Sequence, residues 1–199
     1  MQVRSLSPEA LLGAYADGAF PMTDPDGVTR WYTADPRGVI PLDDRFHVPG
    51  TLRQVIRQKR FEIRVNFDFP TVMTACMRTR RRGEQGSWIS PELIAAYTRL
   101  HAIGHAHSVE AWQGDRLVGG LYGVSLCGAF FGESMFHRVR DASKVALVAL
   151  VERLRERGFT LLDAQASTRH LRRFGCLEIP SADYLQLLDA ALERNCRFD

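Results

Sequence analysis

The segment 141–154 constrains the fold more than any other part of this 199-residue sequence, because it is so rich in apolar residues. Its spacing indicates a helix, and a helix this apolar must be largely buried. The segments 107–112, 116–126 and 129–136 precede it, have the composition of strands and are separated by turn residues. Another strand is expected at 159–164. We therefore predict an α+β protein with a buried central helix and a central, mostly antiparallel sheet.

Helix-start signals place the other helices. Ser7 and Ser90 are each followed by Pro and Glu, which is typical of an N-cap before proline at the first helical position. Asp141 is expected to cap the central helix. From Phe20 to Pro49 the density of Pro, Gly and Asp excludes a continuous helix. Helices are further expected near 52–56, 72–77, 167–174 and 181–194, and a strand near 61–67. We divide the chain into a small N-terminal lobe (1–42) and a main domain (43–199).

The composition excludes several classes of protein. With 45% hydrophobic and 25% charged residues the chain is not wholly disordered. No apolar run reaches the about 18 residues that a transmembrane helix needs, and the first residues lack the apolar core of a signal peptide. The four cysteines form no C-x-x-C pair, and the histidines at 101, 105 and 107 have no acidic or cysteine ligand nearby. We expect a cytoplasmic protein with reduced thiols and no metal.

The positive charge is carried almost entirely by arginine. Of the 26 basic residues only Lys59 and Lys144 are lysine. Either a GC-rich genome explains this excess, or planar guanidinium groups are used to recognise phosphate. The candidates for contact with nucleic acid are Arg53, Arg57, Arg60, Arg78, Arg80, Arg81 and Arg82, although arginines of this kind also occur in ordinary solvated loops.

Three polar side chains stand in strands that are otherwise apolar. Glu133, in the stretch 131–136, is either an outward-facing edge residue or an anion aimed into an apolar cavity, where it would hold an ammonium group. Asp163 and Gln165 are two apart on a strand, so their side chains share one face. They are either surface residues at a strand end or a hydrogen-bonding pair that orients a nucleophile.

The order of the elements is that of an acyltransferase. In the acetyltransferase superfamily, the helix after the central strands carries a glycine-containing loop that binds the phosphates of the acyl donor. Here the corresponding stretch, 137–143, contains no glycine. A coenzyme A pyrophosphate would find no backbone nest for close approach. If the chain is an acyltransferase, we expect a donor other than coenzyme A.

Several short blocks in a fixed order carry a resemblance over most of the chain. They are Gly18–Pro21, Ala34–Arg37, Gly86–Ile89, Leu100–Glu110, Gly119–Val124, Phe131–Phe136, Ala142–Lys144 and Glu178–Pro180. In these blocks the sequence resembles the leucyl/phenylalanyl-tRNA–protein transferases, the bacterial enzymes of the N-degron pathway. Met22 departs from the pattern, because the family usually has tryptophan there.

The resemblance implies an acetyltransferase-like (GNAT-like) domain that uses aminoacyl-tRNA and needs no cofactor. Leu, or less often Phe or Met, would be transferred to proteins with N-terminal Arg or Lys. Asp163 and Gln165 would lie at the reacting centre, and Glu133 would bind the α-amino group of the donor. The apolar pocket and its aromatic neighbours would be formed by Leu121, Phe130, Met135, Leu150, Leu154, Leu162, Trp88 and Tyr97. A monomer is expected.

Three alternatives remain at this point. A related transferase adds Leu to N-terminal Asp or Glu, and the charge of the acceptor is hard to read from sequence. A coenzyme A-dependent N-acetyltransferase fits the order of the elements but lacks the phosphate loop. A non-catalytic RNA-binding module fits the arginines but leaves Glu133, Asp163 and Gln165 without a role.

Overall fold

A seven-stranded, mostly antiparallel sheet forms the centre of the computed structural model, which describes residues 6–79 and 86–199. The only parallel pair among the described strands is β7 with β8. The predicted α+β class with a mostly antiparallel sheet is confirmed. In spatial order the strands are β4 (Glu62–Val65), β5 (Ala106–Gln113), β6 (Arg116–Leu126), β7 (Ala129–His137), β8 (Leu161–Gln165), β3 (Arg37–Ile40) and β9 (Leu177–Ile179).

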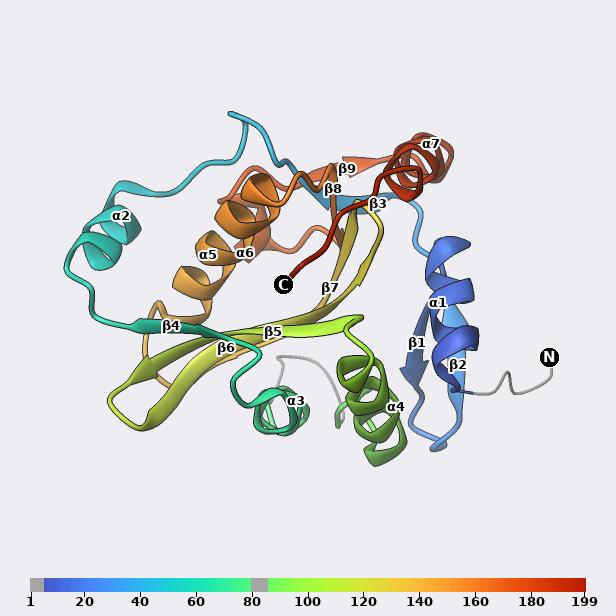
Figure 1. The fold of residues 1–199 in the computed structure, drawn as a ribbon, viewed down its shortest axis with the longest axis horizontal. Coiled ribbons are helices and arrows are strands. Elements are labelled where there is room, and N and C mark those ends of the chain that lie inside the picture. Colours follow the sequence, from blue (N-terminus) through green and yellow to red (C-terminus); the bar gives the residue numbers. More distant parts are fainter. Residues whose placement is uncertain (1–5, 80–85) are drawn as a thin grey trace.

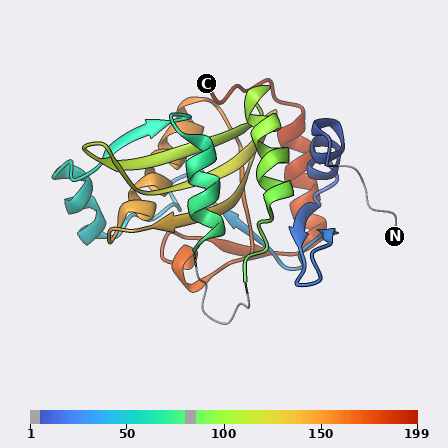
Figure 2. The same ribbon diagram turned by 90° about the horizontal axis from the view of Figure 1, so that it is seen from below.

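Helices cover both faces of this sheet (Figure 1). The predicted central helix, α5 (Ala142–Glu156), packs on β5 and β6, and nine of its residues are buried. On the opposite face lie α3 (Phe69–Met77) and α4 (Pro91–Ala102), which Figure 2 shows in front of the strands. Strand β6 is buried between them along nearly its whole length: Leu121 packs in the core around α5 and its neighbour Tyr122 in the core around α4.

The serine caps form as the sequence predicts. In α1 (Pro8–Ala16) Ser7 accepts a hydrogen bond from the backbone N–H of Ala10, and Ser90 caps α4 in the same way. Asp141 is the N-cap residue of α5, as predicted, but its side chain accepts no hydrogen bond from a backbone N–H of the helix and instead pairs with Lys144 Nζ at 2.5 Å. The remaining helices are α2 (Gly50–Arg57), α6 (Arg169–Arg172) and α7 (Ser181–Leu192).

Short strands occupy the segment that has no long periodic pattern in the sequence. β1 (Phe20–Thr23) and β2 (Thr29–Tyr32) form a hairpin beside α1, as Figure 1 shows. β3 lies between β8 and β9 in the main sheet. It falls within the predicted lobe 1–42, so this part of the chain contributes directly to the sheet of the main domain.

Two glycines in β6 allow close packing on both sides of the strand. A Cβ added to Gly119 would lie 2.5 Å from Cβ of Ala142, at the start of α5. A Cβ on Gly123 would lie 2.3 Å from the backbone oxygen of Phe131 in β7. These contacts are shorter than packed atoms tolerate, so glycine at these positions sets how closely α5 and β7 approach β6.

None of the helices within residues 6–79 and 86–199 is long and apolar enough to cross a membrane.

We predict that Gly119→Ala lowers the free energy of unfolding by about 1–3 kcal/mol, because the new methyl group overpacks the α5–β6 contact. Urea denaturation followed by circular dichroism measures this as a lower midpoint. Gly13→Ala in α1 is the matched control. Its Cβ meets nothing within 4 Å, so the better helix former should raise the stability by about 0.5–1 kcal/mol. Equal midpoints for Gly119→Ala and the unsubstituted protein would contradict this packing account.

Candidate active site

A cavity of about 340 Å³ opens between the central strands, α5 and α6. Its lining is mostly apolar, and its polar residues include Glu133 and Gln165 at the end formed by β7 and β8, and Thr168 and His170 at α6. Of the residues predicted for the apolar pocket or its aromatic wall, five line this cavity: Leu121, Met135, Leu150, Leu162 and Trp88. Ile40, Leu147, Leu171 and Met22 also line the cavity. The sequence did not indicate that these four residues would do so. Such a cavity suits a small apolar group with one polar end.

Glu133 carries the polar end of the cavity on β7. Its side chain is only 8% exposed, and it accepts hydrogen bonds from three different elements. Tyr15 of α1 donates to Oε1 at 2.7 Å, Gln165 Nε2 donates to Oε1 at 3.0 Å, and Tyr97 of α4 donates to Oε2 at 3.3 Å. The two tyrosine hydroxyl groups also contact each other. Glu133 is thus a buried carboxyl group at one end of a mostly apolar cavity and not an outward-facing edge residue.

Burial raises the pKa of Glu133, and so does the nearby charge of Asp163, whereas the hydrogen bonds from Tyr15, Gln165 and Tyr97 lower it. The net result is a pKa of about 7. No cation forms an ion pair with Glu133 among the described residues. The carboxylate is therefore costly to ionise in the empty cavity, and a positively charged group placed beside it would lower that cost.

Asp163 is fully buried and is held by an ion pair that the sequence did not reveal. Arg37 of β3 donates to both its oxygens, from Nε at 3.0 Å and from Nη2 at 2.6 Å. Tyr184 of α7 donates to Oδ2 at 2.9 Å. The guanidinium group also lies over the rings of Phe20 and Tyr184, and it donates to the backbone oxygen of Gly18. Asp163 is therefore not exposed to a ligand as a free carboxylate.

Gln165 is positioned by Asp163 through its backbone. The backbone N–H of Gln165 donates to Asp163 Oδ1 at 2.7 Å, and the residue has a φ of 61°, in the left-handed region that a side chain rarely adopts. The two side chains do not bond each other, although the strand spacing suggested a side-chain pair. Because Nε2 of Gln165 donates to Glu133, the amide carbonyl oxygen Oε1 is the group left to accept a hydrogen bond from a ligand.

Not every predicted residue lies at the cavity. Phe130 stacks on Phe198, and Leu154 is buried in the core around α5, so the structure places both outside the cavity. Tyr97 lies behind Glu133 and reaches the site through its hydroxyl group. Among the predicted nucleic-acid contacts, Arg53, Arg57 and Arg60 are exposed on and after α2, and Arg78 is exposed at the end of α3. Arg80, Arg81 and Arg82 lie outside the described residues.

Four polar residues of the site were not found from the sequence alone. Arg37 belongs to the block Ala34–Arg37, which carries part of the family resemblance. Only its burial shows that it is the ion-pair partner of Asp163 and not a surface cation. Tyr15 and Tyr184 lie on apolar helix faces, where an aromatic residue usually signals core packing. His170 lines the cavity, and burial lowers the pKa of its ring, which favours neutral imidazole near pH 7. Its Nε2 is buried without a hydrogen-bond partner among the described residues.

Two protein-family models match the sequence. One, described as "Leucyl/phenylalanyl-tRNA protein transferase", matches residues 39–189, and the other, described as its N-terminal domain, matches residues 4–35. A leucyl/phenylalanyl-tRNA–protein transferase from Herpetosiphon aurantiacus is 56% identical over 98% of this chain and 99% of that protein. One from Akkermansia muciniphila is 53% identical over 94% of this chain and 97% of that protein.

Among solved structures, L-PGS from Bacillus licheniformis covers 81% of this chain and 51% of that chain with a TM-score of 0.43 and 12% identity, a likeness too low to support a conclusion.

The sequence matches extend over nearly the whole chain and include the residues that line the cavity. They define the class: the chain is an aminoacyltransferase. It belongs to the leucyl/phenylalanyl-tRNA–protein transferase family.

The buried carboxylate of Glu133 should make the stability depend on pH. Because its folded pKa is raised from 4.5 to about 7, the folded state keeps a proton that the unfolded chain has lost between these values. The free energy of unfolding should therefore fall by about 3 kcal/mol as the pH rises from about 4.5 to above 7. Urea denaturation of the protein and of Glu133→Gln across this range measures it, and the variant should lack this part of the fall. The same pH dependence in both proteins would contradict the raised pKa.

Proposed function

We propose that this enzyme transfers Leu, and also Phe or Met, from aminoacyl-tRNA to the α-amino group of proteins that begin with Arg or Lys, and so marks them for degradation in the N-degron pathway. One observation carries the proposal. An apolar cavity ends in a buried carboxylate without a cationic partner among the described residues, directly beside an amide that is fixed by hydrogen bonds. Only a ligand with an apolar body and an ammonium group next to the reacting carbon meets all these features.

The donor amino acid would bind with its side chain in the cavity and its α-ammonium group at Glu133. Leu121, Leu150 and Leu162 supply apolar walls that suit a long unbranched or γ-branched side chain. Selection among such side chains rests on shape, and one methylene group discriminates by only about 1–3 kcal/mol. The acceptance of Leu, Phe and Met by one site follows from this weak discrimination.

Gln165 would orient the attacking amine. An amide is far too weak a base to remove a proton, so its carbonyl oxygen accepts a hydrogen bond from the amine and aligns the nitrogen with the ester carbon. An α-amino group has a reference pKa of about 7.7–8.0, so an appreciable fraction is neutral near pH 7 without a strong base. Asp163, held by Arg37, keeps Gln165 in place and acts as a positioning residue.

The reaction balances without a cofactor. A bond forms between the acceptor nitrogen and the carbonyl carbon of the donor, while the ester bond to the 3′ oxygen of the tRNA breaks. The proton lost by the amine goes to the 3′ oxygen, directly or through water. The ester is already activated, so positioning is the main task of the protein.

The exposed arginines would bind the tRNA. Arg53, Arg57 and Arg60 lie on or directly after α2, and guanidinium groups bind RNA phosphates without reading sequence. Binding of this kind weakens steeply as the salt concentration rises.

The acceptor preference and several coarser features rest on the family resemblance and are part of this proposal. They are a GNAT-like fold of the main domain (43–199), an N-terminal lobe (1–42) from which β3 joins the main sheet, a cytoplasmic location and a monomeric state. Transfer of Leu to N-terminal Asp or Glu is the nearest alternative. It differs only in the acceptor, so the choice of acceptor peptide distinguishes the two.

Radiolabelled Leu-tRNA offered to peptides that begin with Arg, Lys, Asp or Ala tests the proposed function. We expect label in the Arg and Lys peptides only. Transfer to the Asp peptide instead would identify the related transferase. Acetylation of any peptide from acetyl-coenzyme A, without transfer from Leu-tRNA, would overturn the proposal.

Gln165→Met keeps the length of the side chain but removes both its donor and its acceptor. We predict that kcat falls by about 100-fold, because the alignment of the amine is lost. KM for Leu-tRNA should stay within about twofold, because Glu133 loses one hydrogen bond but keeps those from Tyr15 and Tyr97. Steady-state transfer to an Arg peptide measures both constants. Gln186→Met, at an exposed position of α7, is the control and should keep both constants. An unchanged kcat in Gln165→Met would exclude the positioning role.

A further inference from the structure

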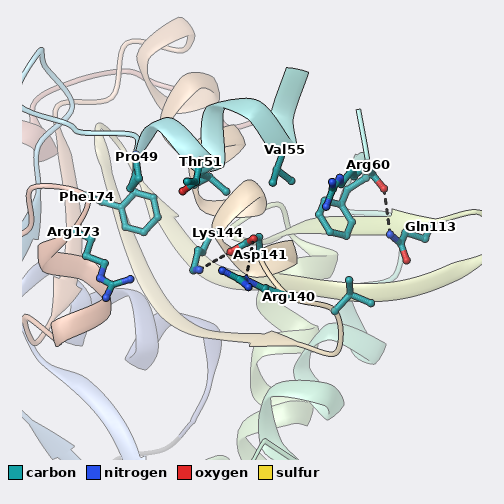
Figure 3. A pocket seen from close by; sticks show the side chains of 13 residues that line it. Pro49, Thr51, Val55, Arg60, Gln113, Arg140, Asp141, Lys144, Arg173 and Phe174 are labelled. Atoms are coloured by element: carbon teal, nitrogen blue, oxygen red, sulfur yellow. Dashed lines mark hydrogen bonds and ion pairs between the residues drawn. The ribbon is translucent and has the colours of Figure 1, made fainter. Parts of the chain in front are cut away.

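A second cavity, of about 410 Å³, lies at the start of α5 and is lined by four cations (Figure 3). They are Arg60, Arg140, Lys144 and Arg173, and they come from three separate parts of the chain, because Arg140 and Lys144 both lie at the start of α5. One carboxylate, that of Asp141, accompanies them in the lining. The cavity therefore has an excess of positive charge. The binding of the donor amino acid in the cavity that ends at Glu133, called the donor cavity below, does not explain this excess.

The lining combines this charge with an apolar floor. Leu52 and Val55 of α2, Phe61 and Phe174 contribute apolar surface. An inorganic anion alone would leave that surface without a partner. A nucleotide unit of RNA fits both parts, because its phosphate is anionic and the faces of its base are apolar.

The cations form a row rather than converge on one point. In Figure 3, Lys144 and Arg140 lie between Arg173 at one end and Arg60 at the other. Lys144 is 29% exposed and pairs with Asp141 at 2.5 Å, but an ammonium group has three donors and so keeps two for a ligand. Arg140 is 93% exposed, and its Nε lies 3.6 Å from Asp141, so its guanidinium group is available. A row of cations suits successive phosphates of a strand better than a single phosphate.

The cavity lies next to the donor cavity described above. Lys144 lines the second cavity and Leu147 lines the donor cavity, and the two residues are about one helical turn apart on α5. Leu171 and Phe174 are separated in the same way at α6. At its other end the cavity reaches Arg60, and thus the arginines on α2. A strand that leaves the donor cavity would pass through this one before it reaches α2.

We propose that this cavity binds the single-stranded 3′ end of the donor tRNA, with Arg140, Lys144 and Arg173 on its phosphates, next to the aminoacylated nucleotide. The assignment rests on the proposed function, since it takes aminoacyl-tRNA as the donor. It adds three phosphate-binding residues to the arginines expected from the sequence.

The test compares two donors that differ in the RNA beyond the aminoacylated nucleoside. Leu-tRNA carries the phosphodiester strand, whereas 3′-O-leucyl-adenosine carries the same ester without it. We expect Lys144→Gln and Arg173→Gln, combined in one protein, to raise KM for Leu-tRNA by about tenfold or more with kcat unchanged. The KM for leucyl-adenosine should not change. The slope of log KM against log salt should also become shallower, by about 0.7 for each lost phosphate contact.

Two further variants sharpen the test. Arg99→Gln removes an exposed arginine from α4, on the opposite face of the sheet, and should leave KM for Leu-tRNA unchanged. Asp141→Asn removes the one carboxylate of the lining, so it should lower KM for Leu-tRNA. A KM that does not fall counts against the proposal.

The outcomes separate this proposal from the proposed function. Absence of transfer from either donor by the unsubstituted protein refutes the proposed function itself. Normal transfer by that protein, with an unchanged KM for Leu-tRNA in the double variant, refutes only the RNA site. An equal rise in KM for both donors in the double variant would indicate damage to the fold and would also overturn the proposed RNA site. An effect of free AMP on leucyl-adenosine transfer that disappears in the double variant would make this a site for a free nucleotide, which also overturns the proposal.

Discussion

The ion pair between Arg37 and Asp163 is the interaction on which the arrangement of the site depends. Both side chains are almost completely buried, and removal of one partner of such a pair typically costs about 3–5 kcal/mol. The pair joins β3 to β8, and Tyr184 adds α7 to the same cluster. The N-terminal segment is thereby fixed to the strand that ends in Gln165. The left-handed backbone of Gln165 is held by a hydrogen bond to the same carboxylate, so the orientation of its amide depends on this pair.

The two buried carboxylates of the site have opposite environments, and the difference indicates their roles. Asp163 has a guanidinium partner on both oxygens, and its charge is compensated within the protein. Within the part of the chain that the structure describes, Glu133 has only neutral donors, and its pKa is raised to about 7, chiefly by burial. A carboxylate that lacks a cation in the empty protein is suited to receive one from a ligand. Asp163 is thus a structural anion, and Glu133 is the candidate to bind the ammonium group of the donor.

Much of the fold could be predicted from the sequence, because its long elements have strong periodic patterns. α5 and the three strands before it are of this kind, and their positions agree closely with the structure. β1, β2, β3 and β9 have only three or four residues each, too few for a pattern. β1 and β2 pair with each other in a hairpin, and β3 and β9 form through pairing with strands that are distant in the sequence. The sequence also located Asp141 at the N-cap of α5, but it could not show that the side chain pairs with Lys144 instead of with a backbone N–H.

In the candidate site, too, some residues could be predicted from the sequence and others could not. Glu133, Asp163 and Gln165 stand out in sequence because they are polar residues in apolar strands. Their partners Arg37 and Tyr15 do not, because they come from distant segments and their spacing carries no signal. Phe130 and Leu154 have the right character for the pocket, yet they face other parts of the core. Which apolar residue faces a cavity is decided by tertiary packing.

The central claim is that Glu133 binds the α-ammonium group of the donor. Leucinamide, which carries this group and the leucine side chain, tests it by isothermal titration calorimetry at pH 6 in two buffers of different ionisation enthalpy. At this pH Glu133 is mostly protonated and the ligand mostly charged, so binding should release nearly one proton per ligand. The release should be absent in Glu133→Gln. Binding without proton release in the unsubstituted protein, or the same release in the variant, would contradict the claim.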